Sequence, residues 1–441
     1  MTDKKLTERV YGYLAEDEDA RVCKDIPESA CNEQPRSFVL MLLSLTLTKL
    51  GDSLVSARLV LPWMLSSLGA PAMFISALVP LRESLALLPQ LFVAQKLREQ
   101  PVRKWFWVAG SIGQAVSLLA MLFAVATLDE SALGWSVVVL LAIFSLSRGI
   151  CSVANKDVTG KTVSKTRRGR MSGVAASAAG LLTLLTALVI IFAPDMEGQR
   201  SLFVGLLGAG VVLWFVAALL YAGIPEVAGA TEGGGNALTE ALKSMSLLWQ
   251  DRQFGHFVIS RALLVAAAFA IPYIVVLIQR EGESELTSLG SLMLASGLAG
   301  LLAGRFWGRW SDSASHHVMA AASVMSTLVI SAALALYYWI PEALGAQWVA
   351  ALLLFSSAVA HHGARVGRKT YLVDMATQDN RAQLTAVSNT VMGVVLLAGL
   401  LLGWVDAAYG VAVVLWALGA IGLLATLAAL RLPDVSGDTS G

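Results

Sequence analysis

The chain has 441 residues, of which 56% are hydrophobic and only 14% charged, and its formal net charge is +1. Soluble globular domains carry about a quarter charged residues, so this composition excludes an ordinary soluble domain. The near-neutral charge excludes a polybasic nucleic-acid-binding protein. The mean hydropathy of +0.68 and the repeated long apolar runs predict an all-α membrane protein.

A polar extension opens the chain, and twelve long apolar runs follow it. The first 36 residues carry mixed charge and lack the apolar segment of a cleavable signal peptide. Each later run is long enough to cross a bilayer core as a helix, which needs about 20 residues. The runs span approximately 38–66, 70–95, 104–127, 132–155, 171–193, 200–223, 254–279, 287–307, 317–340, 346–370, 383–403 and 407–430.

The longest connection, 224–253, separates the runs into two groups of six. It begins with a Pro- and Gly-rich part, which is typical of a flexible linker, and continues as an amphipathic helix from about Ala237 to Trp249. The predicted organisation is an extension (1–37), a six-helix bundle (38–223), the linker (224–253), a second six-helix bundle (254–430) and a tail (431–441).

The two groups of runs also resemble each other in sequence, because 140–177 and 353–389 align at an offset of 213 residues. At that offset the matched positions are Val153 with Val366, Lys156 with Lys369, Arg168 with Arg381, and Ser172 with Thr385. A repeat at about half the chain length indicates two similar halves, as in many transporters.

Charged residues at the ends of the runs predict the orientation. Lys and Arg gather between runs 2 and 3, 4 and 5, and 10 and 11, whereas the turns after runs 1, 3, 9 and 11 have none. Because cytoplasmic loops are enriched in Lys and Arg, we expect both termini and the linker in the cytoplasm. Cys23 and Cys31 precede the first run, so we place them in that reducing compartment and expect no disulfide.

Short motifs at the ends of the runs resemble those of the major facilitator superfamily. The segment 308–317 reads GRWSDSASHH, a fair copy of the family signature G-x-L-x-D-R-x-G-R-R, whereas the first-half copy at 93–104 lacks its glycine and aspartate. An acid at the end of the tenth helix with an arginine seven residues later also fits the family. The positions concerned are Gly308, Arg309, Asp312, Asp374, Arg381 and Arg168, which is the first-half counterpart of Arg381.

The resemblance implies twelve transmembrane helices in two pseudo-symmetric six-helix bundles. It also implies a multi-pass protein of the bacterial inner membrane that acts as a monomer in the lipid bilayer. In that fold the fifth and eighth helices meet between the bundles. Small residues at four-residue spacing let helices cross closely, so we expect a packing role for Gly300 and Gly304, and for Gly173 opposite them.

Ionisable residues inside the runs are the candidates for function, because a charge at mid-bilayer is costly and needs a partner or a wet cavity. The cations are Lys49, Arg58, Arg82, Arg148, Arg261 and Arg365, and the acids are Asp52 and Glu83, with His361 and His362 as further titratable groups. Except for Arg58, we take the cations as candidate substrate ligands, since guanidinium groups bind carboxylates and phosphates. The acids and histidines are candidates for proton coupling.

Structural roles compete with each of these assignments. Lys49 and Asp52 are three residues apart, hence on one helix face, which favours a pair between them. Arg82 and Glu83 are adjacent and must point to different faces, where they can form interhelical salt bridges. Three further alternatives stay open: Arg148 pairs with Asp157, and Arg261 and Arg365 reach the cytoplasmic face by snorkelling.

The sequence therefore predicts a secondary active transporter that moves a small organic anion or zwitterion by alternating access, coupled to protons. It contains no phosphate-binding loop of the Walker type and no nucleophile–base constellation, so we expect neither enzyme activity, nor a cofactor, nor a metal. Two alternatives remain. One is a polyspecific exporter of hydrophobic compounds, and the other is a non-transporting membrane receptor or assembly factor.

Overall fold

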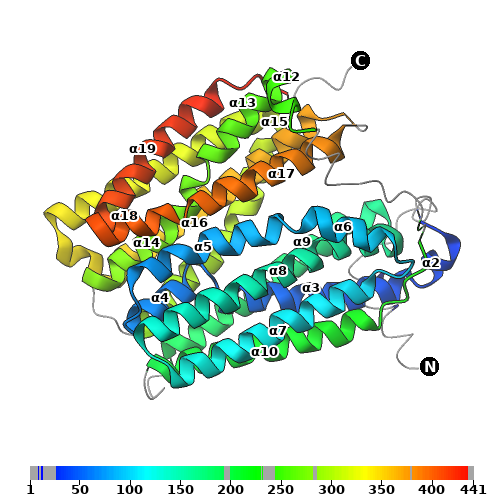
Figure 1. Ribbon diagram of the computed structural model, residues 1–441, viewed down its shortest axis with the longest axis horizontal. Helices are drawn as coiled ribbons and strands as arrows, with labels where there is room; N and C mark the ends of the chain where they lie inside the picture. Colours follow the sequence, from blue (N-terminus) through cyan, green and yellow to red (C-terminus); the bar gives the residue numbers. More distant parts are fainter. Residues whose placement is uncertain are drawn as a thin grey trace.

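The computed structural model describes residues 8, 11–12, 26–192, 199–229, 231, 244–281, 286–377 and 380–435. Within these ranges all regular structure is helical, and the helices form two bundles (Figure 1). Eleven described helices are long and apolar enough to cross a membrane, and a shorter apolar helix covers Ser288–Gly304. The predicted all-α fold with twelve spans is confirmed.

The first bundle contains the elements from α2 to α10. Their bounds are α2 (Glu28–Asn32), α3 (Gln34–Leu54), α4 (Val60–Ser67), α5 (Ala72–Leu87), α6 (Gln90–Arg98), α7 (Lys104–Thr127), α8 (Glu130–Thr162), α9 (Lys165–Phe192) and α10 (Gln199–Ala222). The first predicted run is two helices, α3 and α4, joined by non-helical backbone at 55–59. The second run breaks before Pro89, because proline lacks an amide hydrogen and restricts the residue before it.

The second bundle contains the elements from α12 to α19. Their bounds are α12 (Leu247–Gln250), α13 (Arg252–Leu263), α14 (Ala266–Glu281), α15 (Leu286–Trp339), η1 (Pro341–Gly345), α16 (Gln347–Met375), α17 (Arg381–Ala398), α18 (Leu401–Tyr409) and α19 (Val411–Leu430). The continuous α15 contains predicted runs eight and nine, with non-helical backbone at Ala314. Of the predicted linker helix, the part before residue 244 lies outside the described residues, and α12 is the described part.

The two bundles converge at one end of the molecule, which we call the far end, where α4, α14 and α18 lie (Figure 1). They separate toward the other end, which we call the terminal end, where α2, α6 and α12 lie. At the far end Gln279 Nε2 donates to the carbonyl of Trp63 at 3.2 Å. Nearer the middle, Ser84 Oγ donates to the carbonyl of Gly393 at 2.8 Å. The molecule is therefore closed at the far end.

Helices α9 and α15 pack against each other between the bundles, as the sequence predicted, but at different glycines. A Cβ at Gly290 would lie 2.7 Å from Ile191, and one at Gly297 would lie 2.9 Å from Leu184. A Cβ at Gly173 or Gly304 would meet nothing within 4 Å, and one at Gly300 only His362 Nε2 at 3.7 Å. Those three glycines make no close helix contact in this conformation, because they lie toward the terminal end, where the bundles separate, so their packing role stays a prediction.

The cysteine prediction is wrong. Cys31 in α2 is disulfide-bonded in the structure, whereas Cys151 within α8 is a buried free thiol. The prediction had relied on the compartment alone and did not consider the local geometry.

Candidate functional site

A cavity of about 370 Å³ lies between the two bundles, and most of its wall is charged. The first bundle contributes Asp52, Ser56, Ala57, Arg58, Val79, Arg82, Glu83, Ala86 and Arg148, and the second contributes Arg365, Arg368 and Lys369. Six of these residues are cations and two are acids. We call this the central cavity, and its lining gives it a surplus of positive charge.

Three local features of the chain place these side chains. The break between α3 and α4 puts Ser56 and Arg58 on non-helical backbone beside Asp52. Arg82 and Glu83 lie on α5, two and three residues after Pro80, which is inside that helix. In α16, positions 365, 368 and 369 are three and four residues apart, so their side chains lie on one helix face.

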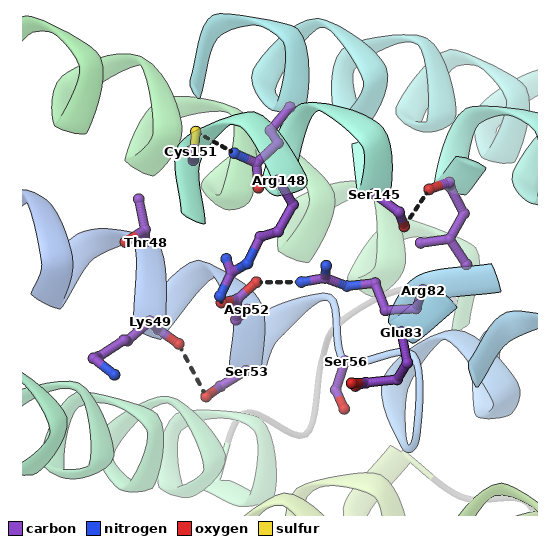
Figure 2. Close-up of polar contacts among 12 residues, drawn as sticks. Thr48, Lys49, Asp52, Ser53, Ser56, Arg82, Glu83, Ser145, Arg148 and Cys151 are labelled. Atoms are coloured by element: carbon purple, nitrogen blue, oxygen red, sulfur yellow. Dashed lines mark hydrogen bonds and ion pairs between the residues drawn. The ribbon is translucent and has the colours of Figure 1, made fainter. Parts of the chain in front are cut away.

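The acids of the first bundle are engaged in ion pairs between helices. Asp52 accepts from Arg82 at 2.7 Å and from Arg148 at 2.5 Å, so one carboxylate joins α3, α5 and α8 (Figure 2). Glu83 binds Arg58 at 2.6 Å. Such charge-assisted contacts are short and strong. They fix the wall of the first bundle and leave its arginines largely neutralised.

These contacts settle several of the alternatives. The adjacent Arg82 and Glu83 do point to different partners, as predicted. The predicted pair between Lys49 and Asp52 is not formed, because two arginines occupy the carboxylate and the Lys49 side chain extends away from it (Figure 2). Arg148 does not bind Asp157, since Asp157 pairs instead with Arg103 at 2.5 Å and Lys161 at 3.1 Å.

The cations of the second bundle differ from those of the first. In the described part of the chain, Arg365, Arg368 and Lys369 form no ion pair. They face a wall of mixed charge. Arg365 is repelled by Arg58 and Arg148 and attracted by Glu83 and Asp52. Lys369 interacts only with cations, among them Lys49 and Lys156. The cavity therefore holds more positive than negative charge, and an anion bound between its walls would reduce the repulsion among the cations.

Three other predicted site residues lie outside the lining of the central cavity. Arg261 on α13 is buried and donates to Ser388 Oγ at 2.5 Å and to Asn389 Oδ1 at 2.9 Å on α17, so it links two helices. Its assignment as a substrate ligand is not supported. His361 is buried among the described residues with its Nε2 atom unpartnered, and the rings of His361 and His362 are 6.3 Å apart. Their role in proton coupling stays a prediction.

The motif residues lie toward the terminal end of the molecule. Arg309 and Asp312 are exposed on α15 and make no ion pair within the described chain, and Gly308 has open space beside it. Arg168 donates to the carbonyls of Val163 and Gly160 at 2.8 and 2.9 Å and so caps the end of α8. Asp374 is exposed on α16. The side chain of Arg381 lies outside the described residues.

Sequence reasoning missed an acid that replaces the aspartate absent from the first-half motif. Glu226, which follows α10, accepts from the backbone amides of Arg103 and Lys104 at 2.7–3.0 Å, at the start of α7. It also binds Lys161 Nζ at 2.9 Å. A carboxylate at a helix N-terminus satisfies free amides and suits the helix dipole. The position of Glu226 directly after a proline at the start of the linker was the sequence signal that could have identified it.

Arg368 and Lys369 were read as loop charges, although their spacing from Arg365 already placed them on one helix face. No group of three or more His, Cys, Asp or Glu residues that could hold a metal ion occurs in the described chain.

The comparisons with known proteins agree with this architecture. The family model of the Major Facilitator Superfamily matches residues 41–364. A search of curated proteins finds no match.

Solved structures of similar fold include a mutant of the nucleoside transporter NupG, with TM-score 0.70 and 12% identity over 90% of this chain and 99% of that one. A POT family transporter in complex with 5-aminolevulinic acid has TM-score 0.70 and 9% identity over 90% and 95%. The xylose transporter XylE from E. coli, in a partially occluded inward-open conformation, has TM-score 0.64 and 13% identity over 92% and 100%. Identities this low show the fold alone. With the family model spanning more than half of its length, the chain belongs to the Major Facilitator Superfamily.

Proposed function

We propose that the protein is a secondary active transporter that carries a small organic anion or zwitterion across the bacterial inner membrane by alternating access. The observation that carries the proposal is the row of three unpaired cations on one face of α16, opposite the ion-paired wall of the first bundle. Guanidinium and ammonium groups in a cavity within a membrane are stabilised by a bound carboxylate or phosphate. Among the relatives of similar fold, one is in complex with 5-aminolevulinic acid, itself a zwitterion.

In this mechanism the anion enters from the terminal end and binds between α16 and the wall formed by α3, α5 and α8. Its negative charge removes the repulsion between the two bundles, which lets the terminal end close. The far-end contacts, such as Gln279 with Trp63, then break and release the anion on the other side. In alternating access the site lies between the bundles, and the bundles close over it at one end at a time.

Proton coupling is assigned to Asp52, with Glu83 as the second acid. Asp52 holds Arg82 and Arg148 together. A proton on Asp52 removes its charge and releases both guanidinium groups for the anion. Proton binding and anion binding therefore favour each other, which couples the two fluxes in the same direction.

The charged lining argues against the two alternatives. Eight of the twelve residues around the central cavity are ionisable, whereas sites for hydrophobic compounds are lined mostly by apolar and aromatic side chains. A receptor without transport activity has no use for unpaired charges in a cavity at membrane depth, because such charges are costly.

The test is uptake of radiolabelled organic anions and zwitterions into proteoliposomes, with a library narrowed first by thermal stabilisation of the purified protein. We expect Arg368→Gln to abolish uptake, because Arg368 lines the cavity without an ion pair. Arg252→Gln, at an exposed position at the start of α13, is the matched control and should transport normally. Normal uptake by Arg368→Gln, or uptake of uncharged compounds only, would refute the proposal.

A further inference from the structure

A second cavity, of about 230 Å³, lies inside the first bundle beside the central cavity. Arg148 lines both cavities, so the two adjoin at that side chain. The second cavity is enclosed by residues of α3, α7, α8 and α10, and the aromatic rings of Trp107 and Trp214 form part of its wall. Ligand sites commonly have volumes of about 300–1,000 Å³. The second cavity alone is below that range, and the two together fall within it.

The lining of the second cavity is positive. Lys49, Arg148 and Lys156 contribute to it, and no acid does. Lys49 and Lys156 form no ion pair within the described residues. On α8, positions 148, 152 and 156 are four residues apart, so they share the face that borders this cavity. This wall is therefore a second place that lacks a negative charge, separate from the row on α16.

The two sets of unpaired cations face each other across the molecule. Lys369 of the second bundle interacts electrostatically with Lys49 and Lys156 of the first, and Lys49 also interacts with Arg365. Lys49 is also attracted by Asp52, but that carboxylate already binds Arg82 and Arg148. A single anionic group bound at α16 leaves the lysines of the second cavity without a counterion.

We propose that the two cavities form one bipartite site for an organic dianion, a small molecule with two acidic groups separated by a short carbon chain. One acidic group binds Arg365, Arg368 and Lys369, and the other binds Lys49 and Lys156. Arg148 lies between them, and the aromatic wall contacts the carbon chain. This inference rests on the proposed function and narrows its substrate class to diacids.

The geometry also gives the second acidic group a purpose. One molecule that binds both bundles holds them together, whereas two separate monoanions neutralise each wall without linking them. A dianion that bridges the bundles stabilises the closed terminal end more than the open one, and only such differential binding shifts a conformational equilibrium.

The experiment measures binding to the purified full-length protein by isothermal titration calorimetry. The probes are straight-chain dicarboxylates of four to six carbons and the monocarboxylates of equal length, and 3-phosphonopropionate tests a phosphonate as the second acidic group. We expect the best dicarboxylate to bind about tenfold more tightly than its monocarboxylate, as an extra charge-assisted contact provides.

Three variants separate the subsites. Lys156 is exposed and lines the second cavity but not the central one. Lys156→Gln should therefore weaken dicarboxylate binding about tenfold and leave monocarboxylate binding unchanged. Lys156→Arg should restore the preference. Arg368→Gln should weaken both ligands. An unchanged melting temperature of the ligand-free Lys156→Gln protein shows that the effect is not one of folding.

The outcomes distinguish this inference from the proposed function. Equal affinity for monocarboxylates and dicarboxylates, or an equal loss of both in Lys156→Gln, overturns the bipartite site while anion binding stands. If no probe and no other organic anion binds the folded protein, the proposed function fails as well. Tighter binding of the phosphonate than of the dicarboxylates keeps the bipartite site and identifies its second acidic group as a phosphonate or phosphate.

Discussion

Replacement of Asp52 by asparagine tests the central ion-pair cluster most directly. The substitution keeps the side-chain volume but removes the charge that Arg82 and Arg148 share at 2.7 and 2.5 Å. Loss of one partner of a fully buried pair costs about 3–5 kcal/mol. Here the side chains of Arg82, Asp52 and Arg148 are 16%, 21% and 33% exposed, so water in the cavity reduces the expected loss to about 1–3 kcal/mol.

The same variant should bind anions better than the wild-type protein. Two guanidinium groups without a carboxylate partner become available to the substrate, so we expect affinity to rise about tenfold. The anion should also restore the lost stability. Its stabilising effect on the melting temperature should therefore be larger in Asp52→Asn than in wild type.

The dependence on pH gives the decisive readout. Under the proposed coupling, a proton gradient should drive anion uptake by wild type and anion binding should depend on pH, whereas Asp52→Asn should lose both dependences. Calorimetry at several pH values, with uptake into proteoliposomes with and without a pH gradient, measures both effects. Glu83→Gln, which breaks only the pair with Arg58, is the comparison variant. Full gradient-driven uptake by Asp52→Asn, or an unchanged pH dependence of binding, would refute the reasoning.

Three further predictions concern the frame around the site. Glu226→Gln removes the charge that caps the start of α7 and should lower unfolding free energy by about 1–2 kcal/mol. The control Glu99→Gln removes one partner of an exposed ion pair and should change the unfolding free energy by less than about 0.5 kcal/mol, measured by thermal melting. An equal loss of stability in the two variants would contradict the capping role of Glu226. A Cβ added at Gly403 would lie only 2.9 Å from Ser76 Cβ, so Gly403→Val should push the two bundles apart at the far end. Spin-label distances between α4 and α14 should then increase, and unchanged distances would exclude a far-end gate there. Alkaline phosphatase fused after Gly410 should be active and after Arg431 inactive, and the reverse pattern would overturn the predicted orientation.

Much of the architecture was readable from the sequence, because hydropathy and Lys/Arg placement are local signals. The twelve spans and the opposite partners of Arg82 and Glu83 follow from run length and helical spacing alone. The partners of Asp52 do not, because Arg82 and Arg148 come from other helices. Sequence spacing favoured the near neighbour Lys49, which the three-dimensional packing turns away.

The other features that the sequence did not predict have a similar physical origin. Arg368 and Lys369 were counted as loop charges although the predicted run 346–370 already contained them, and α16, which continues to Met375, places both on a helix face. Glu226 acts on backbone amides more than 120 residues earlier in the chain. Tyr11 is buried with its ring 5.3 Å from that of Phe38, although composition suggested only a polar surface extension.

The unpaired row on α16 has a consequence for the kinetics of the cycle. When the central cavity closes without cargo, Arg365, Arg368 and Lys369 lose water while facing like charges, and desolvation of unneutralised charge is costly. A bound anion neutralises these charges and lowers the free energy that the same closure requires. Under the proposed cycle the loaded carrier reorients faster than the empty one. One-for-one exchange of anions across the membrane should then outpace net uptake, because net uptake requires the slower return of the empty transporter.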